Sequence, residues 1–205
     1  MFTVGGLLTN CYVVWCEKTK ETIIVDPAFD TALEADEIFR FIEDSSLKLR
    51  FIVNTHGHPD HTCGNALVKE KYRTPILIHE ADAHLLGETG RRLAQFFGFS
   101  SSSPSADVLL QNEDLVRFGN STLKVWHTPG HTRGGISLVG EKEVFTGDTL
   151  FEGSIGRVDF PESSEEDMKS SLLKLVRLPD EFIVYPGHGL TTTIGKEKRL
   201  NPFLQ

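Results

Sequence analysis

Three imidazoles and one carboxylate occur within six residues of the chain, in the segment 54–61, which reads Asn-Thr-His-Gly-His-Pro-Asp-His. The apolar residues 51–53 before it predict a buried strand, and Gly57 and Pro59 end that strand, so the polar side chains lie on a tight loop. Such crowded groups would compete for protons unless a cation bound them. Neutral imidazole with carboxylate suits divalent zinc, iron or manganese. A solvated polar loop is the alternative, and the His-x-His-x-Asp-His spacing disfavours it.

Three later apolar runs end in the same way, each in a turn that contains glycine and then a single ligand-type side chain. The run 123–126 is followed by His131, the run 144–145 by Asp148 and the run 182–185 by His188. Ligands gather at the carboxyl ends of strands, because loops can vary there while the sheet stays rigid. One such side chain would be a weak signal, but the repetition indicates that all of them converge in space.

Together these positions form a set of seven candidate metal ligands: His56, His58, Asp60, His61, His131, Asp148 and His188. Seven ligands exceed the four of a tetrahedral zinc site, but they suit two ions that share one bridging carboxylate. We therefore predict two divalent metal ions, with zinc as the first choice and iron or manganese as alternatives. The remaining candidates, His79, His84 and His127, lack this context and are predicted to lie outside the site.

The elements that position these groups can be read from hydrophobic periodicity. In the first half, strands are predicted at 11–16, 21–26, 51–53 and 75–78, with one helix after Thr31 and another over 62–72. The first two strands indicate an antiparallel hairpin, and Thr31-x-x-Glu34 is a capping box. Asp26, at the end of the second strand, is interpreted as a turn former; orienting a metal-bound imidazole is the alternative role.

The second half is rich in strands. They are predicted at 108–111, 115–118, 122–126, 135–139, 144–145 and 182–185, with one helix opened by the capping box Ser163-x-x-Glu166. This order of strands and helices predicts an α/β protein with two sheets and helices outside them, a four-layer αβ/βα sandwich. We expect a single domain over residues 1–205.

Residues 88–105 differ from the rest of the chain. They combine Arg91 and Arg92 with Phe96, Phe97 and Phe99, and then enter a run of serines. The serine run cannot build a core, so we expect it to be mobile and the segment to border the mouth of the site with an apolar wall. A plain connection with its aromatic side chains in the core is the alternative.

Composition narrows the classes of function. The net charge of −8 and the pI near 5.5 argue against nucleic-acid binding, because no basic stripe is available to neutralise phosphates. Three cysteines without a Cys-x-x-Cys pair indicate small buried thiols in a reducing compartment. No apolar run is long enough to cross a membrane, and no leader is visible, so we expect a cytoplasmic protein without a membrane partner.

With these motifs in place, the chain resembles the metallo-β-lactamase superfamily, in its glyoxalase II-like branch of short hydrolases. The resemblance covers nearly the whole chain and rests on six motifs: residues 56–61, 128–132, 146–150, 156–159, 186–189 and 201–204. It implies that His56, His58 and His131 hold one metal. Asp60, His61 and His188 would hold the other, and Asp148 would bridge the two.

The resemblance also implies an activity. A thioester such as S-lactoylglutathione, or a related acyl thiol, would be cleaved by a hydroxide that bridges the two ions and is oriented by Asp60, the expected catalytic residue. The chain departs from full-length glyoxalase II, because it ends soon after His188 and carries Gly-Arg-Val-Asp at 156–159, where those enzymes bind glutathione. We therefore expect weak preference for the glutathione part.

Other functions remain open. The Gly-Arg-x-Asp form is shared with persulfide dioxygenases of the same superfamily, so a one-iron persulfide dioxygenase is the main alternative. Arg157 and Asp159 are interpreted as a structural ion pair, with contact to an acidic substrate as the second reading. An inactive metal-binding module is disfavoured by the complete ligand set, and a nuclease by the acidic charge.

Overall fold

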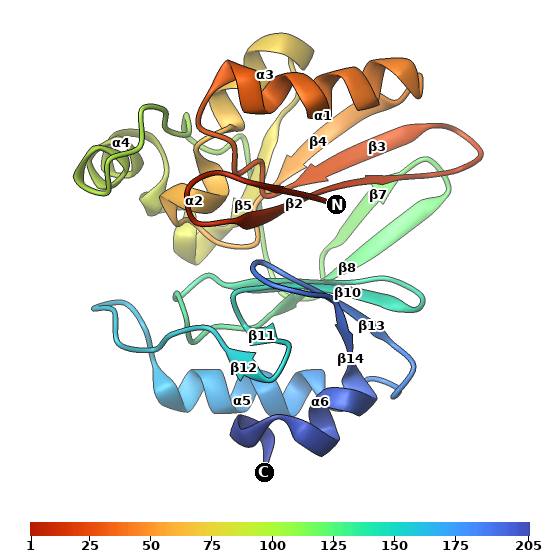
Figure 1. Cartoon of the computed structure of the whole chain (residues 1–205), viewed down its shortest axis with the longest axis vertical. Helices are drawn as coiled ribbons and strands as arrows, with labels where there is room; N and C mark the ends of the chain where they lie inside the picture. Colours follow the sequence, from red (N-terminus) through yellow and green to blue (C-terminus); the bar gives the residue numbers. More distant parts are fainter.

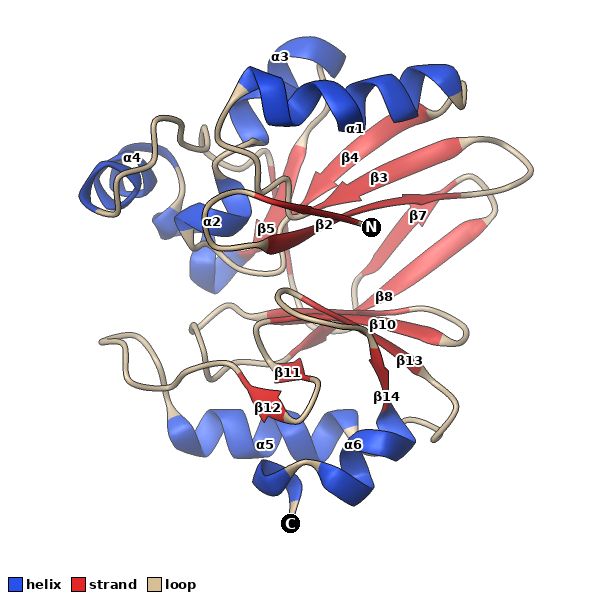
Figure 2. Ribbon diagram, viewed as in Figure 1, coloured by secondary structure: helices blue, strands red, loops and turns tan.

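The computed structural model describes all residues 1–205, and the chain forms four layers (Figures 1 and 2). Helices α1 (Ala32–Asp44) and α3 (Asn65–Tyr72) cover the outer face of one sheet, and helices α5 (Glu165–Leu175) and α6 (Ile194–Leu200) cover the other. The two sheets face each other in the middle. The predicted α/β fold, a four-layer αβ/βα sandwich, is confirmed. None of the helices is both long and apolar enough to span a membrane.

The first sheet is built mainly from the first half of the chain. Its six strands lie in the order β1 (Phe2–Val4), β2 (Thr9–Trp15), β3 (Glu21–Val25), β4 (Lys48–Val53), β5 (Ile76–His79) and β6 (Val108–Leu110). β2 and β3 form the predicted antiparallel hairpin, and β3 to β6 run parallel to one another. Parallel pairing places the ends of β3, β4 and β5 at one edge, where the loop 54–61 begins.

The second sheet is built from the second half. Its strands lie in the order β14 (Thr192–Thr193), β13 (Ile183–Pro186), β10 (Glu143–Gly147), β9 (Ile136–Val139), β8 (Ser121–His127) and β7 (Leu115–Phe118). A separate hairpin of β11 (Leu150–Phe151) and β12 (Ser154–Ile155) follows β10. β10 and β13 are parallel, so the loops that carry Asp148 and His188 leave the sheet side by side.

The positions at which the helices begin confirm one prediction from the sequence and correct two others. The capping box at Thr31 and Glu34 opens α1 as expected. The helix predicted over 62–72 is instead two helices, α2 (Pro59–Thr62) and α3. The helix is interrupted at Gly64, where the backbone passes close to a neighbouring loop. A Cβ at this position would lie 2.5 Å from the carbonyl oxygen of Pro27.

The start of α5 lies one residue later than predicted. Ser164 caps the helix, and its hydroxyl accepts a hydrogen bond from the backbone N–H of Asp167. The hydroxyl of Ser163 is used elsewhere, because it donates to the carbonyl of His131 at 2.8 Å. The expected cap at Ser163 is therefore wrong, and that serine braces the site instead.

The two sheets are held together by an apolar core between their inner faces. Val53 and Tyr12 from the first sheet pack in one buried cluster with Phe118, Val125 and Phe145 from the second. The Tyr12 hydroxyl crosses between the sheets and donates to the carbonyl of Pro186 at 2.6 Å. Close packing of this kind is stiff, so the loops at the shared edge are mounted on a rigid base.

Candidate metal centre

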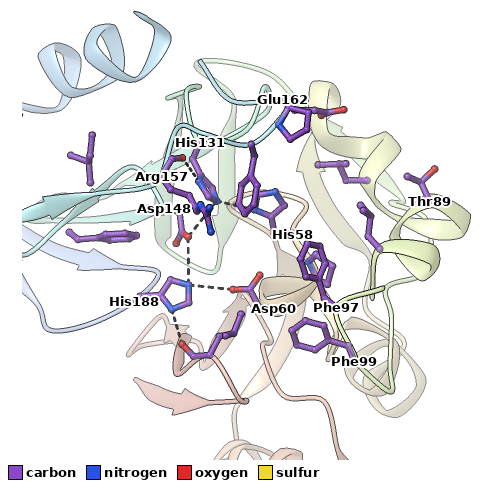
Figure 3. A pocket seen from close by; sticks show the side chains of 18 of the residues that line it. His58, Asp60, Thr89, Phe97, Phe99, His131, Asp148, Arg157, Glu162 and His188 are labelled. Atoms are coloured by element: carbon purple, nitrogen blue, oxygen red, sulfur yellow. Dashed lines mark hydrogen bonds and ion pairs between the residues drawn. The ribbon is translucent and has the colours of Figure 1, made fainter. Parts of the chain in front are cut away.

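All seven predicted ligand side chains converge at the edge where the two sheets meet. The loop after β4 and the short helix α2 supply the first four, and the loops after β8, β10 and β13 supply one each. Figure 3 shows His58 and Asp60, from one segment, pointing toward His131, Asp148 and His188, which come from three other loops. The convergence predicted from the repeated strand ends is therefore present.

The donor atoms form three overlapping groups that could each hold a metal ion. Within each group every ligand atom lies within 4.8 Å of the others, and the groups are His56–His58–His131, His56–His61–Asp148 and Asp60–His61–His188. Two of the groups share His61 and two share His56. This arrangement has room for two neighbouring ions.

Asp148 lies at the centre of the seven. Its Oδ1 is 3.4 Å from Nε2 of His61, and its Oδ2 is 3.5 Å from Nε2 of His131 and 3.6 Å from Nε2 of His188. One carboxylate thus faces imidazoles from both ends of the cluster.

Asp26 fixes the orientation of His61. Its carboxylate accepts a hydrogen bond from Nδ1 of His61 at 3.0 Å and two more from the backbone N–H and the hydroxyl of Thr55, at 2.7 and 2.6 Å. The bond to Nδ1 turns Nε2 of His61 toward the cluster. Asp26 ends β3 in a left-handed conformation with φ 49°, as a turn former does, and its bond to His61 supports the alternative role as the outer partner of a candidate ligand.

Backbone carbonyls play the same part for two other histidines. Nδ1 of His131 donates to the carbonyl of Arg157 at 2.8 Å, and Nδ1 of His188 donates to the carbonyl of Leu7 at 3.2 Å. Both rings therefore present Nε2 to the centre. These partners come from loops far away in the chain, and no sequence signal identifies them.

The electrostatic environment keeps two of the imidazoles neutral. Burial lowers the pKa of His56 well below its ordinary value, and the neighbouring His61 adds to this effect. Burial, together with the nearby His131, lowers the pKa of His58 to about 4. Both rings therefore carry free lone pairs at neutral pH, which is the state that binds a metal.

The carboxylates at the centre stay ionised. Burial opposes the charge on Asp60, but His61 and His188 hold its pKa well below the ordinary value. Burial opposes the charge on Asp148 too, but His61 lowers its pKa. Burial would lower the pKa of His61, yet the carboxylates of Asp148, Asp60 and Asp26 raise it well above its ordinary value. The centre thus combines anionic oxygens with a site where positive charge is favoured.

Two buried atoms in the cluster have no hydrogen-bond partner, namely Nε2 of His56 and Oδ1 of Asp148. A buried polar atom without a partner is costly and rare, so each calls for a ligand. Both atoms belong to the same candidate group, with His61 as its third member. Imidazole nitrogen and carboxylate oxygen are donors of the kind that divalent zinc, iron and manganese accept, so the residues fit such ions.

Asp82 was missed by the sequence analysis. It lies in the 3₁₀ helix η1 (Glu80–Leu85), is fully buried, and accepts hydrogen bonds from the N–H of Gly57, the hydroxyl of Thr132 and the N–H of Gly134, at 2.9, 2.7 and 2.6 Å. Burial raises its pKa. It ties the loop that carries His58 to the loop that follows His131, and nothing local in the sequence distinguishes it from a surface aspartate.

A cavity of about 700 Å³ opens in front of the cluster. Helix α4 (Gly87–Phe96) and the residues after it line one side with Thr89, Leu93, Phe97 and Phe99, so the segment 88–105 borders the site as predicted. Phe96 does not line the cavity, and its side chain is 82% exposed.

The serine run that follows α4 is not a loose tether. The N–H groups of Ser100 and Ser101 donate to the carboxylate of Asp30 at 2.8 and 2.7 Å, and Nδ2 of Asn65 donates to the buried hydroxyl of Ser103 at 2.8 Å. An acceptor in the loop before α1, Asp30, and a donor in α3, Asn65, thus hold the run in place, and its expected mobility stays a prediction.

The remaining candidates divide between the cavity and the protein interior. His84 lies outside the metal groups but lines the cavity, where its Nε2 is 3.2 Å from the carboxylate of Glu162. His79 and His127 stack on each other with ring centroids 4.1 Å apart, away from the cluster. The ion pair of Arg157 with Asp159 is confirmed, with two bonds of 2.7 Å. All three cysteines are free and buried, as predicted.

Comparison with known proteins agrees with this geometry. The family model described as the metallo-beta-lactamase superfamily matches residues 4–188. The hydroxyacylglutathione hydrolase GloC of Haemophilus influenzae is 37% identical over 210 residues, which cover 98% of this chain and 95% of that protein.

Two solved structures show the same fold over nearly the whole chain. TTHA1623, crystallised in a di-iron-bound form, has a TM-score of 0.87 at 33% identity and covers 99% of this chain and 98% of its own. ETHE1 from Myxococcus xanthus has a TM-score of 0.78 at 29% identity, and the match covers 95% of this chain and 78% of that one.

Proposed function

The chain belongs to the metallo-β-lactamase superfamily, and we propose that it is a metal-dependent hydrolase that cleaves thioesters with two divalent metal ions. The observation that carries the proposal is the overlap of three donor groups through His56 and His61, with two buried donor atoms, on His56 and Asp148, that lack partners. A hydrolytic site of this type needs no serine or cysteine nucleophile.

The donor groups lead to an assignment of ligands. His56, His58 and His131 would hold one ion, and Asp60, His61 and His188 would hold the second. Asp148 would bridge the two, since its oxygens face imidazoles of both sets. The di-iron form of TTHA1623 supports two ions in a chain of this fold, and zinc is our first choice for this protein, with iron or manganese as alternatives.

The residues of the chain prepare the site for the cleavage of an acyl bond. Divalent ions held there would supply Lewis acidity, which lowers the pKa of water and polarises a carbonyl group. Asp60 lines the cavity with an ionised carboxylate, so it can accept a hydrogen bond from an attacking water and orient it. The outer bonds of His61, His131 and His188 keep the rings in place, so that little reorganisation is needed.

A thioester fits this chemistry because its leaving group needs little help. A thiol has a pKa near ~8.5, so the thiolate can depart without a strong general acid. The similarity to GloC, a hydroxyacylglutathione hydrolase, supports S-lactoylglutathione or a related acyl thiol as the substrate. Where full-length glyoxalase II binds glutathione, this chain carries Gly-Arg-Val-Asp at 156–159 with Arg157 paired to Asp159, so we expect its KM for S-lactoylglutathione to be high.

A one-iron persulfide dioxygenase is the second candidate. It rests on Arg157 and Asp159 within the Gly-Arg-Val-Asp motif and on the likeness to ETHE1, which supports this alternative equally well at the level of the fold. Such an enzyme would consume O₂ and would be inactive with zinc.

Two assays on the purified protein separate the candidates. Zinc- or manganese-loaded protein should contain two ions per chain by elemental analysis and should release thiol from S-lactoylglutathione or a smaller thioester. Iron-loaded protein should consume no oxygen with glutathione persulfide in an oxygen electrode. Oxygen uptake by the iron form, with no thiol released from any thioester under any metal, would rule out the hydrolase.

A further inference from the structure

The cavity is larger than a lactoyl group requires. Its volume of about 700 Å³ is typical of pockets that enclose a ligand of drug size. The five metal-centre side chains that line it, His58, Asp60, His131, Asp148 and His188, form only part of its wall. The remainder of the cavity must therefore contact a part of the substrate that does not react.

That remainder is mostly apolar. Leu85, Leu93, Phe97 and Phe99 come from the segment around α4, and Leu7, Phe151, Ile155 and Phe160 complete the lining from other loops. Figure 3 shows Phe97 and Phe99 together, beyond Asp60 as seen from His188. The Phe97 side chain is 55% exposed in the free protein. An apolar group that covered it would remove that surface from water, which favours binding.

The charged side chains of this part of the cavity are already paired. Arg157 is its one arginine, no lysine lines it, and the guanidinium binds Asp159 through two bonds while lying 4.1 Å above the ring of Phe160. His84 is paired with Glu162. No free cation therefore faces the cavity to bind the carboxylates of glutathione or the phosphates of a nucleotide carrier.

The apolar side of the cavity is mounted firmly beside the metal centre. Leu85 follows the buried Asp82 by three residues and packs so closely on the metal loop that a Cβ at Gly57 would lie 2.5 Å from its own Cβ. At the same end of α4, the backbone N–H of Gly87 donates a hydrogen bond to the carbonyl of Ser103 at 3.2 Å. Packing thus sets the distance between the apolar side of the cavity and the metal centre. This side can therefore select substrate groups by their length.

From these observations we infer that the substrate carries an extended aliphatic or aromatic group, bonded to the thioester and bound against Leu93, Phe97 and Phe99. These three residues, named here the α4 wall, then determine specificity. The inference rests on the proposed thioesterase function and deepens it. The apolar group can belong to the acyl part or to the thiol part, and both present the same chemistry to the α4 wall.

Kinetics with two thioester series tests the inference. One series varies the acyl group from acetyl to hexanoyl on N-acetylcysteamine, and the other varies the thiol from ethyl to hexyl on an acetyl group. In at least one series, kcat/KM should rise by up to about fourfold per methylene. Phe97→Ala and Phe99→Ala should each reduce kcat/KM for the hexyl member by about tenfold, and should reduce it less for the shortest member.

Phe96→Ala is the matched control, because Phe96 is exposed and does not line the cavity. It should leave both series unchanged, and the thermal midpoints of all three variants should confirm folding. A flat response to chain length in both series would overturn the inference, and so would a preference that survives both Phe97→Ala and Phe99→Ala.

A binding measurement separates this inference from the proposed activity. S-methyl and S-hexyl N-acetylcysteamine thioethers cannot be hydrolysed, and calorimetry on the metal-loaded protein should show tighter binding of the hexyl compound. If Phe97→Ala removes that preference, the result supports the α4 wall as a binding surface. If the protein at the same time hydrolyses no thioester, only the proposed activity is refuted. Equal binding of both thioethers to the unmodified protein would overturn the α4 wall.

Discussion

Two groups of histidines stand at strand ends in this protein, and they differ in how their rings meet. In the metal centre, the rings of His56 and His58 are inclined at 85° and those of His58 and His131 at 84°. His79 and His127 are inclined at only 7°, with centroids 4.1 Å apart. Imidazole lone pairs lie in the ring plane, so crossed rings can aim them at one point, whereas stacked rings direct them along parallel planes.

The partners of the rings differ as well. The centre has carboxylates on both sides of its imidazoles, from Asp148 inside and Asp26 outside. In the stacked pair, Nδ1 of His79 accepts from the N–H of Ala81, Nε2 of His127 donates to a backbone carbonyl, and no carboxylate lies within 4.0 Å of either ring. Position at a strand end therefore does not make a histidine a ligand; ring orientation and carboxylate partners do.

Removing the carboxylate of Asp148 should have the largest effect on metal binding by the centre. Asp148→Ala takes away the oxygens that face both sets of imidazoles, so we expect metal affinity to fall by more than the ~100-fold cost of losing an outer partner. Elemental analysis after dialysis and thioester turnover are the measurements. Asp159→Ala, at an exposed carboxylate outside the donor groups, is the control. Two ions retained per chain in Asp148→Ala would contradict the bridging role.

Removing an outer partner should have a smaller effect. Asp26→Asn keeps the shape of the side chain but replaces the anion that holds Nδ1 of His61, so we expect a ~10–100-fold loss of metal affinity. Competition with a chelator of known affinity measures it. Asp30→Asn is matched to it, because Asp30 accepts hydrogen bonds from serines rather than from an imidazole. Equal affinities for the two variants would refute the orienting role.

The stacked pair of His79 and His127 should affect the stability of the fold rather than metal binding. Burial, with the neighbouring His127, lowers the pKa of His79 from an ordinary value of 6.5 to about 4, although Glu80 and Asp114 oppose the shift. Between these two values, His79 binds a proton in the unfolded chain but not in the folded chain. The free energy of unfolding therefore decreases as the pH falls from about 6.5 to about 4.

His79→Gln should therefore weaken the pH dependence of the thermal midpoint in that window, with metal content unchanged. Midpoints between pH 7 and pH 4.5 measure it, as the difference from the unmodified protein. His84→Gln, at a more exposed histidine, serves as the control. Parallel curves for His79→Gln and the unmodified protein would mean that the stack does not act on the folding equilibrium.

Much of the metal centre is predictable from the sequence because its donors follow local rules. Four of them lie within residues 56–61, and His131, Asp148 and His188 each follow a hydrophobic run broken by a turn. The hairpin at β2 and β3 and the cap at Thr31 follow local rules too, since period-two alternation and a capping box depend only on near neighbours.

Such local rules do not predict contacts between segments that are distant in the sequence. Asp82 reaches Gly57 and Gly134 across 25 and 52 residues, and Asp26 reaches His61 across 35. The break at Gly64 depends on Pro27, and the anchored serine run depends on Asp30. Each of these is decided by which loops the packed sheets bring together, and no local pattern carries that information.

The sequence alone thus determined which side chains can bind metal, and that the strand ends must bring them together, because hydrophobic period and turn chemistry are local properties. Only the tertiary structure decided which histidines are crossed and which are stacked, which partner holds each outer nitrogen, and that Phe97 rather than Phe96 faces the cavity. These outcomes depend on the packing of two sheets against each other, where a shift of one residue moves a side chain to the opposite face.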